Sequence, residues 1–475
     1  MSAPLLLSDL PTDIVFSIFA CCDIASVVSV SQTCRCLHAL AFEKSVWLIL
    51  LHDLRRRCIL DRNCTPNLET LSTAEMIEIV RRLITGPQTW NPTEHDSVAE
   101  FSRKITLHPA VTFGDNTAKL LGSGRYILFT NEFRLQCWSV AEDRLVWTHT
   151  SIGDLDLKDI DHEVQGFAAE ETDANLTIMV CIHTFPDDDR RRNYVEMINL
   201  DLRTEKYTSL LVARAPDSDN ADVFSDVFYS AAVRGAIAAA DLSINGIENL
   251  YMIINWKEGL YFIVQGDADP EVGLELALIP SHILLSEKDR FHLISSDVLG
   301  SHGTSTIGLD GPAEFSPVPV FVKDITKLKT IEASDTDQFF DGIYAHESPI
   351  RDGHYSFSIY SSHRVRLRDT SLSYRLSIPT NGEPQWYQRN LSTVDPDLAV
   401  ESVSDAVTYS GHCLYSSTHG APVYTIFSKC SASTSPRIVQ VGLQPIVAEQ
   451  EIHIAPYSGA LTYFTNSLIV VQYYR

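Results

Sequence analysis

The sequence lacks any long run of apolar residues. No stretch of the 475-residue chain approaches the ~18 consecutive apolar residues that a membrane-spanning helix needs. The N-terminus carries no basic segment, and Ser8 and Asp9 interrupt the short apolar stretch Leu5–Leu7, so no secretory signal peptide is expected. These absences predict a protein of the cytoplasm or the nucleus with no membrane partner.

Paired cysteines are also missing. The ten cysteines are scattered along the chain, and none shows the C-x-x-C spacing that zinc sites use. A chain without a secretory signal should keep its thiols reduced. We therefore expect no disulfide framework, no metal and no other cofactor.

Basic residues are scarce. The chain has 37 Lys and Arg against 61 Asp and Glu, and nearly all of the acidic excess lies downstream of residue 90. Binding to a phosphate backbone needs clustered Lys and Arg, so a nucleic-acid partner is disfavoured. The acidic excess could steer a basic protein partner, but simple solubility is the favoured explanation.

The usual catalytic motifs are absent as well. The sequence has no Walker loop, no G-x-G-x-x-G after a strand, no H-E-x-x-H and no G-x-S-x-G. Ser301 stands beside His302, but neighbours in sequence do not form a catalytic triad. We expect a protein that is not an enzyme.

Signals for helices, in contrast, fill the N-terminal region. Pro11 suits the first turn of a helix because its missing N–H needs no partner there, and Asp13 complements the positive end of the helix dipole. Asp23 is a suitable N-cap for a second helix. The β-branched run 27–31 that follows is also compatible with a strand. Apolar residues at helical spacing predict a third and a longer fourth helix: Leu37, Leu40 and Ala41, then Val46, Trp47, Leu50, Leu51 and Leu54.

Such a small helical unit cannot bury all of this apolar surface internally. The surplus indicates a face for a partner protein. Packing against the rest of the same chain would serve equally well, so the residues alone leave both possibilities open.

The whole N-terminal series resembles a full-length F-box. The family pattern has Leu-Pro with an acidic residue, an Ile/Leu-rich helix, an Asp-led second helix, a Val-Ser-x-x-Cys-Arg segment and a later Trp. These landmarks occur in order in Leu10–Phe19, Asp23–Val28, Val30–Arg35, Leu37–Ala41 and Val46–Trp47.

The resemblance implies an F-box domain over residues 5–54 that binds a Skp-type adaptor, which in turn bridges to cullin. Leu10, Pro11 and Trp47 are the expected anchors of this interface. Some contact residues must also hold the F-box's own core, and the sequence does not divide the two roles. The adaptor contacts that carry over by position are Leu10, Pro11, Ile14, Ile18, Val27, Val28, Val30, Cys34, Leu37 and Trp47.

Residues 55–90 are predicted to form a helical connector. The basic run Arg55–Arg57 is interpreted as a solvated helix end, favoured by the negative pole of the dipole. Ser72 and Glu75 make a capping box for an amphipathic helix that stops before Gly86. By the family resemblance, this helix is a rigid spacer.

Residues 91–475 predict an all-β domain, because short apolar alternations separated by turn residues replace the helical pattern. The segment 121–147 resembles one blade of a WD-type propeller. About 385 residues at ~40–50 per blade suggest around eight blades, fewer if the loops are long. A pair of β-sandwiches is the alternative. An F-box joined to a degenerate propeller is similar to the large F-box families of mushroom-forming fungi.

The resemblance implies a non-catalytic substrate-recognition subunit of an SCF-type ubiquitin ligase. In this reading the F-box docks the Skp-type adaptor and the propeller binds a protein substrate whose identity the sequence does not give. The alternative is an F-box scaffold or ligand sensor that acts outside ubiquitination.

Overall fold

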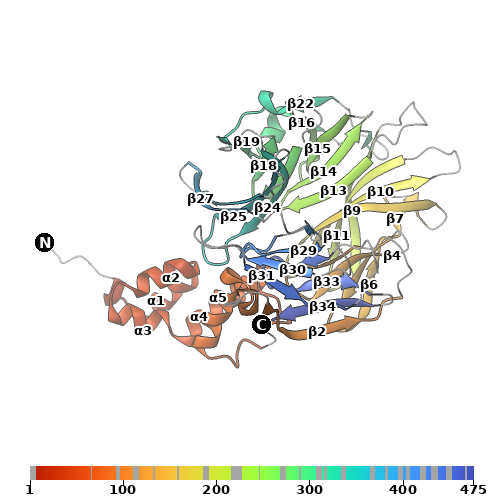
Figure 1. The fold of residues 1–475 in the computed structure, drawn as a ribbon. Helices are drawn as coiled ribbons and strands as arrows, with labels where there is room; N and C mark the ends of the chain where they lie inside the picture. Colours follow the sequence, from red (N-terminus) through yellow and green to blue (C-terminus); the bar gives the residue numbers. More distant parts are fainter. Residues whose placement is uncertain are drawn as a thin grey trace.

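A computed structural model shows a group of N-terminal helices beside a larger ring of β-sheets (Figure 1). The predicted domains 5–54 and 91–475 include some residues outside the described part of the chain. The structure describes residues 7–65, 67–91, 97–110, 117–131, 134–153, 155–157, 160–185, 192–215, 227–244, 247–267, 274–287, 290–305, 313–314, 318–332, 338–363, 370–379, 383–393, 400–402, 407–417, 424–428, 437–444, 452–465 and 468–475.

The N-terminal unit has the four helices that the sequence predicts. Pro11 precedes the first helix, and the Asp23 carboxylate accepts the backbone N–H of Ser26 at 2.7 Å, so both expected helix starts are confirmed. The β-branched run 27–31 is helical because this cap fixes the start of the second helix. After the short 3₁₀ turn η1 (Leu7–Asp9), the helices are α1 (Thr12–Ala20), α2 (Ile24–Ser31), α3 (Arg35–Ala41) and α4 (Lys44–Arg56).

One apolar core holds these helices together. The inward faces of α1 and α4 supply Val15, Phe19 and Leu51, which are almost completely buried. Trp47 joins the same core, and its ring N–H donates a hydrogen bond to the Ala41 carbonyl at 3.1 Å. The indole is therefore both buried and satisfied.

The connector contains the predicted helix α5 (Thr73–Thr85). Its capping box is confirmed, because the Ser72 hydroxyl accepts the N–H of Glu75 while the Glu75 carboxylate accepts the N–H of Ser72. The helix ends at Gly86, whose φ of +76° favours glycine. The short 3₁₀ helix η2 (Gln88–Trp90) then leads into the sheets.

The β domain is a seven-bladed propeller, with one sheet of at least four strands per blade among the described residues. The first four blades are blade 1, β3 (Ala118–Leu120), β4 (Tyr126–Asn131), β5 (Arg134–Ser139), β6 (Arg144–Thr148); blade 2, β9 (Asp161–Glu171), β10 (Asn175–Phe185), β11 (Arg192–Asp201), β12 (Lys206–Arg214); blade 3, β13 (Val227–Arg234), β14 (Ile237–Ile244), β15 (Ile247–Asn255), β16 (Leu260–Gln265); and blade 4, β17 (Leu274–Ile279), β18 (His282–Glu287), β19 (Arg290–Ser295), β23 (Lys329–Glu332).

The remaining blades complete the ring, and a small hairpin of β7 (Ser151–Ile152) and β8 (Leu155–Asp156) follows blade 1. They are blade 5, β24 (Gln338–Glu347), β25 (His354–His363), β26 (Thr370–Ser377), β27 (Gln385–Thr393); blade 6, β28 (Val400–Ser402), β29 (Cys413–Ser417), β30 (Tyr424–Ser428), β31 (Arg437–Val441), with β1 (Ser97–Val98) added in parallel; and blade 7, β32 (His453–Ile454), β33 (Leu461–Phe464), β34 (Ile469–Tyr474), β2 (Phe101–Leu107).

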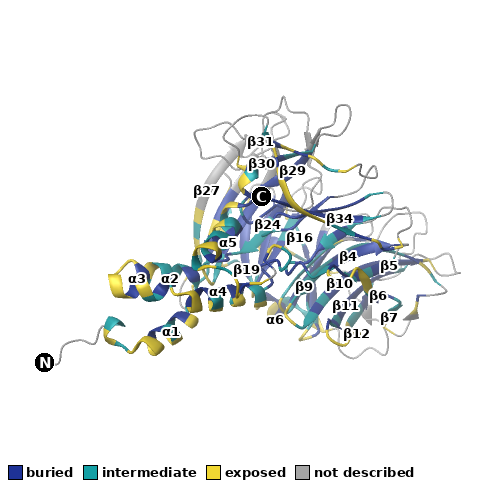
Figure 2. Ribbon diagram, turned by 90° about the horizontal axis from the view of Figure 1, so that it is seen from below, coloured by how far each residue is buried: buried dark blue, intermediate teal, exposed yellow. Residues whose placement is uncertain are grey.

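The ring closes by pairing strands from distant parts of the chain. β2, which follows the connector, lies antiparallel to the C-terminal strand β34, with Ile105 opposite Val471 and Leu107 opposite Ile469. The apolar cores lie between neighbouring blades, as where Leu128 and Leu135 of blade 1 meet Ile178 of blade 2. Figure 2 shows this burial along the strands of the ring.

A long connection between β19 and β23 explains why there are seven blades rather than around eight. It contains the short helix α6 (Val298–His302) and the turn η3 (Val322–Asp324), and it adds strands to the outer edges of other blades. β20 (Thr304–Ser305) and β22 (Pro319–Phe321) pair with β16, and β21 (Ala313–Glu314) pairs with β12. These residues cover exposed sheet edges instead of forming another blade.

Two sequence predictions are thereby settled. The segment 121–147 does lie in one blade, and a propeller replaces the alternative of paired sandwiches. Within the described residues, no helix is both long enough and apolar enough to cross a membrane.

A buried polar pair lies between blades 1 and 2. The ring of His149, just after β6, lies 2.8 Å from the Glu196 carboxylate on β11, and both side chains are fully buried. The second carboxylate oxygen accepts the backbone N–H of Gly153 at 3.2 Å. Glu196 thus contacts a fully buried imidazole ring and also accepts from the backbone of an exposed residue.

Glu196→Ala is expected to lower the free energy of unfolding by about 1–3 kcal/mol, because it leaves the buried His149 ring without its polar partner. Urea denaturation followed by fluorescence measures the loss. Glu205→Ala, which removes an exposed carboxylate paired with Arg144, is the control and should leave the midpoint nearly unchanged. Equal midpoints for the two variants would contradict the prediction.

Candidate functional site: the exposed face of the N-terminal helices

The ten residues predicted to contact an adaptor divide into those that face solvent and those that face the helical core. Pro11, Ile14 and Cys34 are exposed, and Ile14 is 44% accessible despite its large apolar side chain. The partly exposed members of the set are Leu10, Ile18, Val28 and Val30.

The other three residues are buried inside the unit. Val27, Leu37 and Trp47 are at most 5% exposed, and all belong to the helical core. They can shape the outer face by supporting it, whereas the seven others can touch a partner directly. This division was not available from the sequence.

Pro11, Ile14 and Ile18 form an apolar stripe along α1. Their spacing of three and four residues places them on one side of the helix. Val15 and Phe19 lie on the adjoining side, about 100° around the helix from Ile14 and Ile18, and enter the core. The stripe is therefore surface that the helical unit does not bury by itself.

Sequence reasoning missed one exposed apolar residue, Ile49 on α4, which is 43% accessible. The helical pattern of α4 assigns its neighbours Leu50 and Leu51 to the core, as observed. Ile49 falls between the inward positions, so the spacing itself was the available signal.

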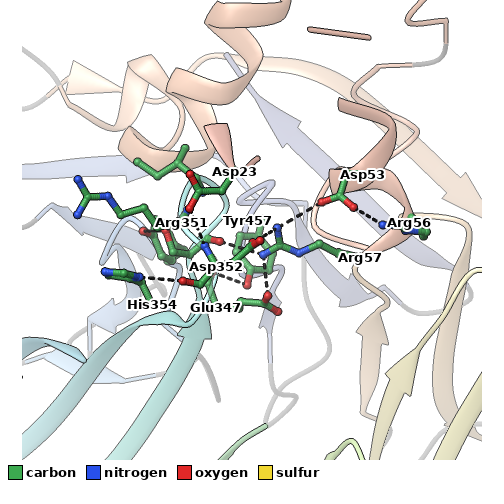
Figure 3. Close-up of polar contacts among 12 residues, drawn as sticks. Asp23, Asp53, Arg56, Arg57, Glu347, Arg351, Asp352, His354 and Tyr457 are labelled. Carbon is green, nitrogen blue, oxygen red and sulfur yellow. Dashed lines mark hydrogen bonds and ion pairs between the residues drawn. The ribbon is translucent and has the colours of Figure 1, made fainter. Parts of the chain in front are cut away.

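The interpretation of Arg55–Arg57 as a solvated helix end is wrong for Arg57. Arg56 fits it, with 75% of its side chain exposed, but the Arg57 side chain is only 20% exposed. Figure 3 shows the Arg57 guanidinium pointing into a group of carboxylates at the junction with the propeller. The polar contacts of Arg57 are Glu347 Oε1 at 2.6 Å, Ser348 O at 3.0 Å, Asp352 Oδ1 at 3.2 Å and Asp53 Oδ2 at 3.5 Å.

These contacts keep Arg57 charged. Burial by itself lowers the pKa of Arg57, but the carboxylates of Glu347, Asp352 and Asp53 outweigh burial and raise it. The junction therefore contains a permanent positive charge shared between the helical unit and the propeller.

The same junction involves the backbone at the start of α2. The N–H of Ala25 donates to the carbonyl of Ile350 at 2.9 Å, and the N–H of Asp352 donates to the Asp23 carboxylate at 3.3 Å. Ile350 also packs against the helical core. The turn between β24 and β25 thus adjoins the N-terminus of α2.

The connector inserts an aromatic anchor into the propeller. Trp90 is fully buried against the rings of Tyr474 and His412. Gly459, at φ +67°, leaves the space that the indole fills, since a Cβ there would lie 2.8 Å from the ring. The N–H of Thr89 donates to the carbonyl of the last residue, Arg475, at 3.0 Å.

Asp61 is a buried carboxylate at the same boundary. It accepts the N–H of Asn63 at 2.7 Å and the hydroxyl of Tyr473, on the closing strand β34, at 2.9 Å. Burial raises the pKa of Asp61 from 3.8 to about 6, although these hydrogen bonds oppose the rise.

A cavity of about 240 Å³ lies where the helical unit meets the centre of the ring. Arg57 and Ile59 line it from one side, and Phe167, Arg234 and Tyr457 line it from the propeller. A second hollow of about 220 Å³ lies between α1, α4 and the β24–β25 turn, and Arg57 lines that one as well. No group of three or more His, Cys, Asp or Glu in the described part of the chain is arranged to hold a metal ion.

Comparisons with known proteins agree with this division of the chain. Residues 7–50 match the F-box-like family model. A search of curated protein sequences gave no match.

The solved structures that match this chain include three of low sequence identity. The WD40 domain of SCAP from fission yeast is 10% identical, with 75% of this chain and 82% of that chain covered and a TM-score of 0.38. A chain of the mitotic checkpoint complex is 9% identical over 82% of this chain and 96% of its own, with a TM-score of 0.40. The N-terminal domain of Nup159 is 10% identical over 81% and 98%, with a TM-score of 0.31.

The fold and the exposed helical stripe define a class: an all-β seven-bladed propeller preceded by a small helical unit with exposed apolar residues. The family match identifies that unit as F-box-like. The chain therefore fits the architecture of an F-box protein with a propeller domain, as the sequence predicts.

Asp61→Asn is expected to stabilise the protein at neutral pH. Because the folded pKa of Asp61 is raised, its contribution to stability is complete below pH 3.8 and is lost as the pH rises through about 6. An amide stays neutral, so the advantage of the variant should grow by roughly 2 kcal/mol between pH 4 and pH 7.5. Urea midpoints across this range measure it. A constant difference between variant and wild type would refute the assignment.

Proposed function

We propose that this protein is the substrate-recognition subunit of an SCF-type ubiquitin ligase. The observation that carries the proposal is the F-box-like match over residues 7–50 combined with the exposed stripe of Pro11, Ile14 and Ile18. A solvent-exposed apolar stripe on a small helical unit is suited to burial against a partner protein. The Skp-type adaptor, and through it cullin, is the proposed partner.

The propeller is proposed to bind the protein substrate at the end of the ring that faces away from the helices. The turns after β3, β24 and β32, each joining the first two strands of a blade, supply Ser123, Ile350 and Gly459 to contacts with the helical unit or the connector. All such turns lie at one end of a propeller. Because the contacts named here lie at this end, we assign the substrate to the opposite end.

In this role the protein acts by proximity rather than by chemistry. Holding a substrate beside the charged conjugating enzyme raises the effective concentration of its lysines. The architecture is typical of non-catalytic adaptors, and no residue is assigned a chemical step. The proposed location is the cytoplasm or the nucleus.

Ile14→Glu is expected to weaken binding of the Skp-type adaptor by about 30-fold or more, the equivalent of losing one interface hot spot. Co-purification of the full chain with the adaptor and cullin, followed by calorimetry, measures this loss. Ile49→Glu is the matched control, because Ile49 is equally exposed but lies outside the predicted contact set.

Three results are informative. Loss of adaptor binding by Ile14→Glu alone supports the proposal. Equal binding by wild type and both variants excludes the α1 stripe as the interface. Binding of adaptor without cullin or ubiquitin transfer would favour the alternative, an F-box scaffold or ligand sensor.

A further inference from the structure

The F-box touches the propeller directly, far from the connector in sequence. The contact is the β24–β25 turn of blade 5, residues 348–353, which bonds to the start of α2 through Ala25 and Asp23. The chain is thus attached at two places, once through the connector and once through this turn. Two attachments restrict a rotation that a single connector would leave free.

We propose that Arg57 is a positioning residue that locks the F-box onto the β24–β25 turn and so fixes the angle at which the propeller is held. Arg57 directly follows α4, the last helix of the F-box, and its partners Glu347, Ser348 and Asp352 belong to β24 of blade 5 and the turn after it. The consequence for ubiquitin transfer rests on the proposed function, but the locked geometry does not.

The guanidinium suits this task because of its shape. Its planar fork presents donors in fixed directions, so it can hold two carboxylates and a carbonyl at once. A lysine ammonium carries the same charge but lacks the fork. The lock should therefore depend on Arg57 in particular and not only on a positive charge.

The lock extends into the ring through Glu347. One oxygen of this carboxylate binds Arg57, while the other lies 2.7 Å from Arg234 at the end of β13. Arg234 also pairs with Glu170 of β9 at 3.4 Å. The chain of contacts connects the F-box with blades 5, 3 and 2, so Arg57 is tied to the scaffold rather than to one mobile side chain.

Packing alone does not fix this junction. Arg57 lines both the cavity at the ring centre and the hollow beside α1, so space lies on two sides of it. Side chains that line a hollow have no packing partners on that side. The directional contacts of Arg57 act together with the backbone bonds of Ala25 and Asp352 to favour one orientation.

The test is the distance between the two domains in the full chain bound to its Skp-type adaptor. Spin labels introduced as a non-canonical amino acid at the exposed positions Ser45 and Glu258 report that distance by electron–electron resonance. Wild type should give one narrow distribution. Arg57→Ala should shift it and broaden it about twofold, as expected for domains joined by a single connector.

Matched variants separate the lock from general effects of charge. Arg56→Ala removes the neighbouring guanidinium, which pairs only locally with Asp53, and should leave the distribution narrow. Arg57→Lys should restore it in part. The double variant Glu347→Gln/Asp352→Asn removes the charges of the propeller residues that bind Arg57. It should shift and broaden the distance distribution as Arg57→Ala does, and it provides the test if Arg57→Ala itself folds poorly. An unchanged distribution in the folded Arg57→Ala and double variants would overturn the proposal.

A second readout links the lock to transfer. In a reconstituted reaction with adaptor, cullin–RING and conjugating enzyme, mass spectrometry identifies which lysines of the chain itself receive ubiquitin. Arg57→Ala should keep adaptor affinity but change this lysine pattern, whereas Arg56→Ala should preserve both. Absence of any transfer by wild type would count against the proposed function, while the distance measurement would still decide the lock.

Discussion

The pairing of β2 with β34 is the constraint on which the rest of the structure depends. A propeller ring is stable only when its last blade is complete, and here one strand of that blade comes from the region just after the connector. Closing the ring therefore fixes the end of the connector. Trp90 and Thr89 are held against the C-terminal residues Tyr474 and Arg475 as a direct consequence.

The same closure places Asp61 in a dry environment. Its carboxylate accepts from Tyr473, which itself pairs with Arg103 of β2, so the loop after α4 is bonded to the closing strand. A buried carboxylate with neutral donors is unfavourable when charged. Asp61 also lies close to Gly124, whose φ is +72°, and a Cβ at that glycine would overlap the carboxylate.

Local signals in the sequence were sufficient for the helical part and for the class of the β domain. Caps at Asp23 and Ser72 fix where α2 and α5 begin, because a capping side chain acts on backbone groups only two or three residues away. Alternating apolar residues likewise predict strands. The number of blades was not predictable. The sequence of a long connection, such as that between β19 and β23, does not show whether its strands form a new blade or pair with the edges of existing ones.

Motif positions predict a set of ten candidate contact residues, but they do not say which of these form a surface. Only the folded unit separates exposed Ile14 from buried Val27 and Trp47. Arg57 was missed for a related reason. Its partners Glu347 and Asp352 lie some 290 residues away, and no local pattern announces a pairing over that separation.

The junction is polar because the small F-box has to keep its own core and also leave an apolar face for a partner. The F-box has limited apolar surface, and it needs α1 and its neighbours open if a partner is to bury them. Joining it to the propeller through another large apolar face would compete for those same residues. Arg57, Asp23 and the backbone of Ala25 instead make directional contacts that use little apolar area. Such contacts add modestly to stability but specify orientation, which is the property that the proposed role of presenting a substrate requires.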